Sequence, residues 1–68
     1  MILFDPFKAR RRRERLEREA LEEAYVLRRR HADGALEAGR LTLQRPDLTS
    51  WGRKVMERAL QLLQDGKA

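Results

Sequence analysis

The feature that most constrains the fold is a long stretch without glycine or proline, from Phe7 to Asp33. Asp5 and Pro6 in front of it are typical of a helix start. An N-cap carboxylate accepts bonds from free backbone amides, and proline at the first helical position loses none. The stretch is rich in Arg, Glu, Leu and Ala, which favour helix. It predicts one long helix over about residues 6–32, roughly 40 Å long at about 1.5 Å per residue.

A second, short helix is predicted over about residues 35–44. Asp33 and Gly34 separate it from the first helix. Gly34 is suited to a left-handed cap, and Asp33 could equally cap the helix that follows. Pro46 ends the second helix, because proline disfavours helical backbone at the residue before it.

A third helix is predicted over about residues 50–64. Thr49 or Ser50 is the expected N-cap, and the helix is expected to stop at Asp65 and Gly66. No segment shows the alternating pattern of a strand. The sequence therefore predicts an all-α fold, a small three-helix assembly.

Apolar residues of the third helix cover nearly half of its circumference. They are Leu48, Trp51, Val55, Met56, Ala59, Leu60, Leu62 and Leu63. One stripe on the first helix would not cover so wide a face, and a chain of 68 residues buries only a modest core. This favours a homodimer, or a protein partner on this face.

Small residues one helical turn apart occur in the first and second helices. Ala20 and Ala24 form one pair, and Ala35 and Gly39 form the other. Such pairs allow two helix backbones to approach closely, so we expect the helices to cross at these residues.

The N-terminal part of the chain lacks a core face. No apolar residue lies between Arg10 and Arg15. Upstream of this gap stand the apolar residues Met1, Ile2, Leu3, Phe4 and Phe7. We therefore expect residues 1–15 to form an apolar tip on a basic stalk outside the core, with a helical core domain over residues 16–68.

Groups for catalysis are scarce. The chain has no cysteine and a single histidine, His31, which lies in a different predicted element from every serine and threonine. One imidazole without a second ligand makes no metal site, and the glycines are too widely spaced for a phosphate-binding loop. We expect no enzymatic activity, no cofactor, no metal and no small-molecule substrate. Apolar content rules out a disordered tail, and no segment is typical of a secretory signal or a membrane span, so a cytoplasmic protein is expected.

The formal net charge of +5 comes mainly from two basic blocks, Lys8 with Arg10, Arg11, Arg12 and Arg13, and Arg28, Arg29 and Arg30. We call the arginines of these two groups the arginine blocks. Between them, residues 14–23 carry five glutamates against two arginines. Phosphate or acidic-partner contact is one interpretation of the arginines. Against it, a run of arginines spreads around a helix axis, neighbouring glutamates pair with them, and no aromatic residue is interleaved.

Three binding functions remain, and we rank them. The first is a non-enzymatic protein-interaction module that binds a partner through Ile2, Leu3, Phe4, Phe7, Trp51 and Met56. The alternative is a basic nucleic-acid-associated protein that contacts phosphates through the arginine blocks. Peripheral membrane contact, through the apolar tip and the cations behind it, comes third.

Overall fold

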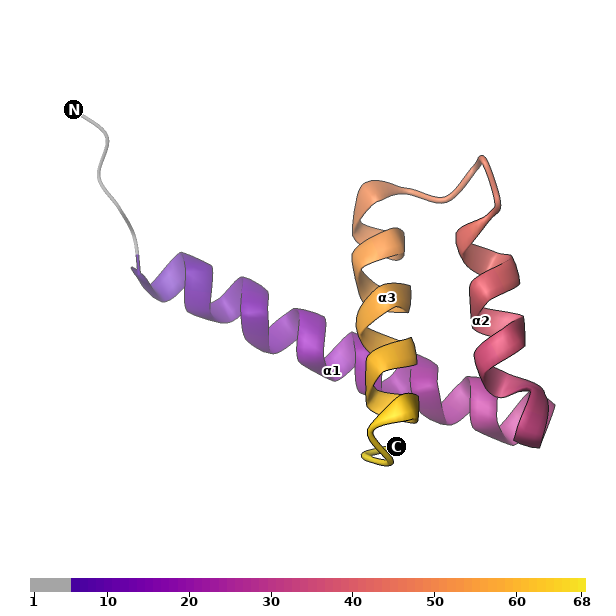
Figure 1. The fold of residues 1–68 in the computed structure, drawn as a ribbon. Helices are drawn as coiled ribbons and strands as arrows, with labels where there is room; N and C mark the ends of the chain where they lie inside the picture. Colours follow the sequence, from indigo (N-terminus) through magenta and orange to yellow (C-terminus); the bar gives the residue numbers. More distant parts are fainter. Residues whose placement is uncertain (1–5) are drawn as a thin grey trace.

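The computed structural model describes the backbone of residues 6–68 and the side chains from Lys8 onward. It contains helix α1 (Pro6–His31), a short 3₁₀ turn η1 (Ala32–Gly34), helix α2 (Ala35–Leu43) and helix α3 (Ser50–Gln64), as Figure 1 shows. Within this described part there is no strand. The all-α prediction is confirmed. None of the described helices is long and apolar enough to cross a membrane.

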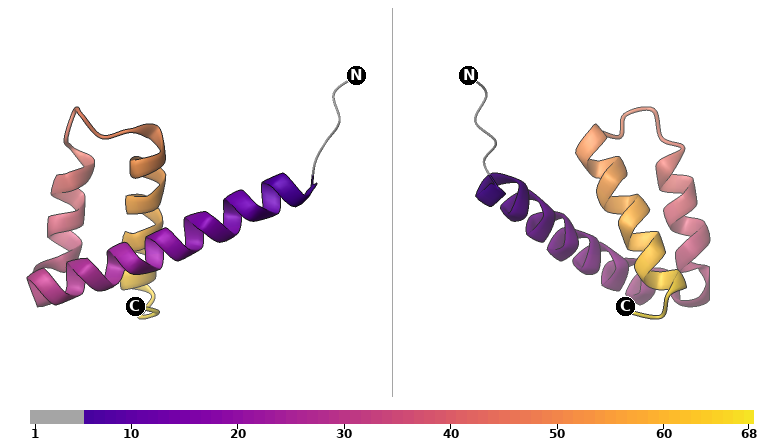
Figure 2. Two further views of the ribbon diagram at one scale, coloured as in Figure 1. Left: turned by 180° about the vertical axis from the view of Figure 1, so that it is seen from behind. Right: turned by 60° about the vertical axis from the view of Figure 1, so that its left-hand side comes forward.

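The prediction of three separate helices is wrong in one respect. Helical structure continues from α1 through η1 into α2, so the described chain has two helical stretches, residues 6–43 and 50–64. The chain changes direction at η1 (Figures 1 and 2).

The residue that makes this turn also differs from the prediction. Ala32 is left-handed, with φ 48°, whereas Gly34 has an ordinary φ of −88°. Gly34, not Asp33, is the N-cap of α2, and no side chain caps the helix there. We attribute the choice to packing, since the turn must bring Leu27 and Ala35 into one cluster. A left-handed alanine costs about 1 kcal/mol, which such burial can offset.

Helix α3 packs against both α1 and α2. Helices α2 and α3 run side by side in opposite directions, and α1 crosses them at one end (Figures 1 and 2). The N-terminal half of α1 extends beyond this body. All side chains described before Leu16 are exposed. The first buried residue of the described chain is Ala20, and the division into a stalk over residues 1–15 and a core domain over residues 16–68 stays a prediction.

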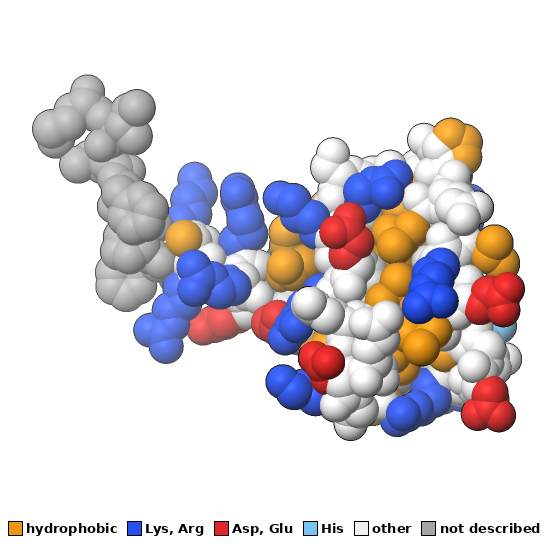
Figure 3. All heavy atoms as spheres, viewed as in Figure 1, with side chains coloured by type: hydrophobic (Ala, Val, Ile, Leu, Met, Phe, Trp, Pro, Cys, Tyr) orange, Lys and Arg blue, Asp and Glu red, His pale blue; other side chains and the backbone are white. Residues whose placement is uncertain are grey.

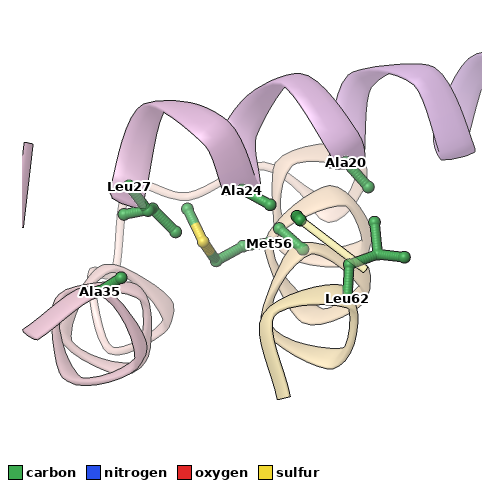
Figure 4. Packing of buried hydrophobic residues seen from close by; sticks show 8 residues of the cluster. Ala20, Ala24, Leu27, Ala35, Met56 and Leu62 are labelled. Carbon is green, nitrogen blue, oxygen red and sulfur yellow. The ribbon is translucent and has the colours of Figure 1, made fainter. Parts of the chain in front are cut away.

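The core forms where the three helices meet, and it is built largely from small residues. Its buried members are Ala20, Ala24, Leu27, Ala35, Met56, Ala59, Leu62 and Ala68 (Figure 4). Ala20 and Ala24 are fully buried, and Gly39 packs against side chains of Leu60 and Leu27. Close helix approach at these small residues is confirmed.

The central part of the apolar face of α3 is covered within the monomer, whereas Leu48, Trp51, Val55 and Leu63 are half-buried. Met56, Ala59, Leu60 and Leu62 are all buried, because both α1 and α2 pack against α3. The monomer therefore covers more of this face than the sequence led us to expect, and only the half-buried residues could meet a partner. A homodimer stays a prediction that needs a different basis.

Both ends of α3 are capped as its sequence predicts. The Thr49 hydroxyl accepts a hydrogen bond from the Gly52 amide at 2.9 Å. After the last turn, Gly66 adopts a left-handed conformation with φ 71°. The amides of Gly66 and the next residue then donate to the carbonyls of Leu63 and Leu62. This pattern is a Schellman motif, which satisfies carbonyls left free at a helix end.

Candidate functional site

One face of α1 carries a row of charged residues that changes sign along the helix. The residues recur every three or four positions, so at about 100° per residue they lie on one side of the axis. We call this row the charged stripe. Its basic half is Lys8, Arg11, Arg12 and Arg15, and its acidic half is Glu19, Glu22 and Glu23.

The basic half of the stripe borders a shallow hollow of about 470 Å³ between α1 and the start of α3, which we call the basic hollow. Its lining residues are Lys8, Arg11, Arg12 and Arg15 from α1, and Trp51 and Lys54 from α3. Figure 3 shows lysine and arginine side chains gathered over the N-terminal half of α1. Among the described residues, Arg11, Arg12 and Lys54 form no ion pair. Their charges are therefore not neutralised by any carboxylate of the described chain.

Trp51 stands at the boundary between the two halves of the stripe. Its indole Nε1 donates a hydrogen bond to Glu19 Oε2 at 2.6 Å. The Arg15 guanidinium lies 5.5 Å from the ring centroid, which is within cation–π range. Arg15 Nε is also 3.5 Å from Glu19 Oε2. These three contacts tie the start of α3 to the middle of α1, and the ring is only partly buried.

A second hollow, of about 370 Å³, lies on the acidic side of Trp51, and we call it the acidic hollow. Its lining residues are Glu19, Glu22, Glu23 and Val26 from α1, and Trp51, Gly52 and Val55 from α3. Val26 is 37% exposed, so the hollow offers apolar surface beside its carboxylates. Trp51 lines both hollows.

Glu14 and Glu17, the other two glutamates of residues 14–23, are engaged in ion pairs. Glu14 accepts a hydrogen bond from Arg10 at 3.3 Å. Glu17 binds Arg58 of α3 through two bonds, of 2.7 and 3.2 Å. The hydrogen bond from Arg58 to Glu17 raises the pKa of the Arg58 guanidinium above its usual value. These pairs reduce the repulsion that Glu14 and Glu17 would exert on an anion.

The structure brings only some of the predicted arginines together. Arg11 and Arg12 line the basic hollow, whereas Arg10 and Arg13 border another face of α1, with Glu14 and Glu17. Arg28, Arg29 and Arg30 are exposed in the last turn of α1. At about 1.5 Å per residue this block lies roughly 25 Å along the axis from the first. The two blocks do not form one surface.

The residues predicted to bind a protein partner also have different outcomes in the structure. Met56 is only 6% exposed and lies in the core between the three helices (Figure 4), so its side chain is not accessible to a partner. Met56 was predicted to contact a partner because it lies on the wide apolar face of α3. It is buried because α1 and α2 pack against that part of the face. Ile2, Leu3 and Phe4, with the side chain of Phe7, lie outside the described residues. Trp51 remains accessible, as part of both hollows.

Lys8, Arg15 and Lys54 line the basic hollow but are not among the phosphate contacts predicted from the sequence. The expectation that arginines spread around the helix is right for the consecutive run. It overlooks that Lys8, Arg11, Arg12 and Arg15 follow a spacing of three, one and three residues, which puts four cations on one face. Lys54 is distant in sequence, and no local pattern connects it to α1.

In the described part of the chain, no three side chains of histidine, cysteine, aspartate or glutamate are grouped as a metal site would require. No protein-family model, no curated protein and no solved structure matches the sequence or the fold. The chemistry of the two hollows is therefore the basis for a functional proposal.

Proposed function

We propose that this protein is a non-enzymatic binding protein whose basic hollow holds the phosphate backbone of a nucleic acid. The observation that carries the proposal is the convergence of five cations and one tryptophan on a single hollow, from helices about 40 residues apart in sequence. Arg11 and Arg12 supply planar guanidinium groups that can bind phosphate oxygens in pairs. Lys54 adds a cation from the opposite side.

Binding at this hollow would gain most of its free energy from counterion release. A nucleic acid carries condensed cations that are freed when arginine and lysine replace them at the phosphates. The acidic half of the stripe repels phosphate, so the strand is expected to stay on the N-terminal side of Trp51. The contact is then limited to a few phosphates, those within reach of Arg11, Arg12 and Lys54.

Two arguments that ranked nucleic acid second do not apply to this surface. Four of the cations share one face of α1, so they are not spread around it. An aromatic side chain, Trp51, does lie beside them. Bases commonly stack on such rings or on arginine planes in nucleic-acid complexes, although one face of Trp51 is already occupied by Arg15.

A protein-interaction module is the second candidate, and the acidic hollow favours it. Glu22 and Glu23 have no ion-pair partner among the described side chains, and Val26 and Val55 lie beside them. Carboxylates next to apolar surface suit a basic segment that also carries apolar residues. The predicted contacts through Ile2, Leu3, Phe4 and Phe7 belong to this candidate.

Charge reversal tests the first candidate. The double substitution Arg11→Glu and Arg12→Glu is expected to weaken binding of a fluorescently labelled oligonucleotide by about tenfold or more, because two phosphate contacts become repulsive. Fluorescence anisotropy, with the duplex and with one of its strands, measures the affinity at a fixed salt concentration.

The matched control is Arg28→Glu with Arg29→Glu. It changes the net charge by the same amount, on equally exposed positions of the same helix. Its effect is expected to be only about twofold to threefold, because screening over roughly 25 Å leaves little interaction at about 0.15 M salt. Equal losses in the two double variants would mean that overall charge attracts the nucleic acid and that the hollow is not a site.

A further inference from the structure

We propose that two copies of this chain pair through the charged stripes of α1, in antiparallel orientation. If two stripes lie antiparallel with Arg15 opposite Glu19, the spacing also sets Arg12 opposite Glu22 and Arg11 opposite Glu23. The residue numbers of each facing pair add up to the same value, so each arginine of one stripe meets a carboxylate of the other in a single register. The fold of the monomer does not itself require the basic and acidic halves of the stripe to match in this way.

The second copy is the occupant because the chain cannot complete these pairs alone. The two halves of the stripe lie on one continuous helix. Arg11 and Glu23 are roughly 18 Å apart along its axis. Among the arginines and glutamates of the stripe, all of which the structure describes, only Arg15 and Glu19, at the boundary, pair with each other. A twofold axis beside α1, near the level of Glu17, satisfies both halves of both copies at once, which makes the arrangement an isologous dimer.

Apolar contact would be concentrated near the twofold axis. Trp51 lies at the boundary of the two halves, so antiparallel pairing brings the two tryptophans toward the axis. Val26 and Val55 border the acidic hollow that receives the basic half of the other copy. Exposed ion pairs are individually weak and are screened by salt, so the dimer is expected to be weak and to dissociate as salt is added.

This inference goes beyond the proposed function and does not depend on it. The two are nevertheless linked, since Arg11 and Arg12 cannot hold phosphate and the carboxylates of a second copy at the same time. Nucleic acid and self-association are therefore expected to compete for the basic half of the stripe.

Sedimentation equilibrium of the full chain at about 0.01 M salt, where screening is weakest, tests the pairing. The wild type is expected to reach twice the monomer mass as its concentration rises. Arg11→Glu with Arg12→Glu, and separately Glu22→Arg with Glu23→Arg, are each expected to remain monomeric. An equimolar mixture of these two double variants is expected to dimerise again, because every facing pair is then complementary. Arg28→Glu with Arg29→Glu should dimerise like the wild type.

Circular dichroism first establishes that each variant keeps its helical content, so that loss of the dimer is not loss of the fold. A mixture that stays monomeric, or single variants that dimerise as the wild type does, would overturn the pairing. A wild-type protein that stays monomeric at every concentration would also overturn the pairing. None of these results bears on oligonucleotide binding by the monomer, so the two proposals fail separately.

Discussion

Replacing Gly39 with leucine is expected to lower the free energy of unfolding by about 3 kcal/mol. The position is buried where α2 packs against α3, and any side chain there would overlap Cδ2 of Leu60 and approach Cδ1 of Leu27 to 3.4 Å. Leu27 and Leu60 are only 5% and 8% exposed, so a leucine at position 39 must displace side chains that are themselves buried. A chain of this length is stable by only about 3–10 kcal/mol, so the substitution removes much of its stability.

Urea denaturation followed by circular dichroism measures this loss. The matched control is Arg40→Leu, which introduces the same side chain one position further along α2, on its exposed face. Its expected effect is within about 0.5 kcal/mol. A Gly39→Leu variant as stable as the control would show that α2 does not pack on α3 as closely as described.

Leu27→Ala is expected to destabilise the protein by about 2–5 kcal/mol, because it leaves a cavity where the three helices meet. Leu27 is 5% exposed, and it is among the largest side chains in a core that is otherwise rich in alanine (Figure 4). The alanines of this cluster (Figure 4) have no side-chain length with which to fill the space, and Met56 can fill only part of it. The cavity should therefore persist.

Leu41→Ala is the control for this variant, because Leu41 is 59% exposed on α2. Its truncation is expected to change the free energy of unfolding by less than about 0.5 kcal/mol. Thermal melts of both variants under one set of conditions give the comparison. Equal destabilisation by the two substitutions would contradict the placement of the core.

Helix positions were predictable because their signals are local. The absence of glycine and proline before Asp33, the cap at Thr49 and the stop at Gly66 each depend on a few neighbouring residues. The turn between α1 and α2 was not predictable in the same way. Gly34 is the better left-handed residue, yet Ala32 takes that conformation, since the requirement to bury Leu27 together with Ala35 outweighs the local preference.

The candidate site was likewise predictable where its residues are close in sequence, and not where they come from different helices. The four cations on one face of α1 follow from their spacing, which a helical projection of the sequence reveals. Trp51 and Lys54 join them only because α3 folds back across α1, and no periodicity connects residues so far apart. Coverage of the apolar face of α3 likewise depends on how α2 and α1 are placed, so the exposure of Met56 could not be judged from its helix alone.

The salt dependence of nucleic-acid binding tests the proposed binding at the basic hollow most directly, because the slope of log affinity against log salt counts the phosphates contacted. Affinity for a DNA duplex is measured at several salt concentrations for the wild type, for Arg11→Ala with Arg12→Ala, and for Arg28→Ala with Arg29→Ala. Each lost phosphate contact reduces the slope of log affinity against log salt by about 0.9, so the first double variant should lose about 1.8 and the second close to none. An unchanged slope in the first variant, or an equal loss in both, would contradict binding at the basic hollow.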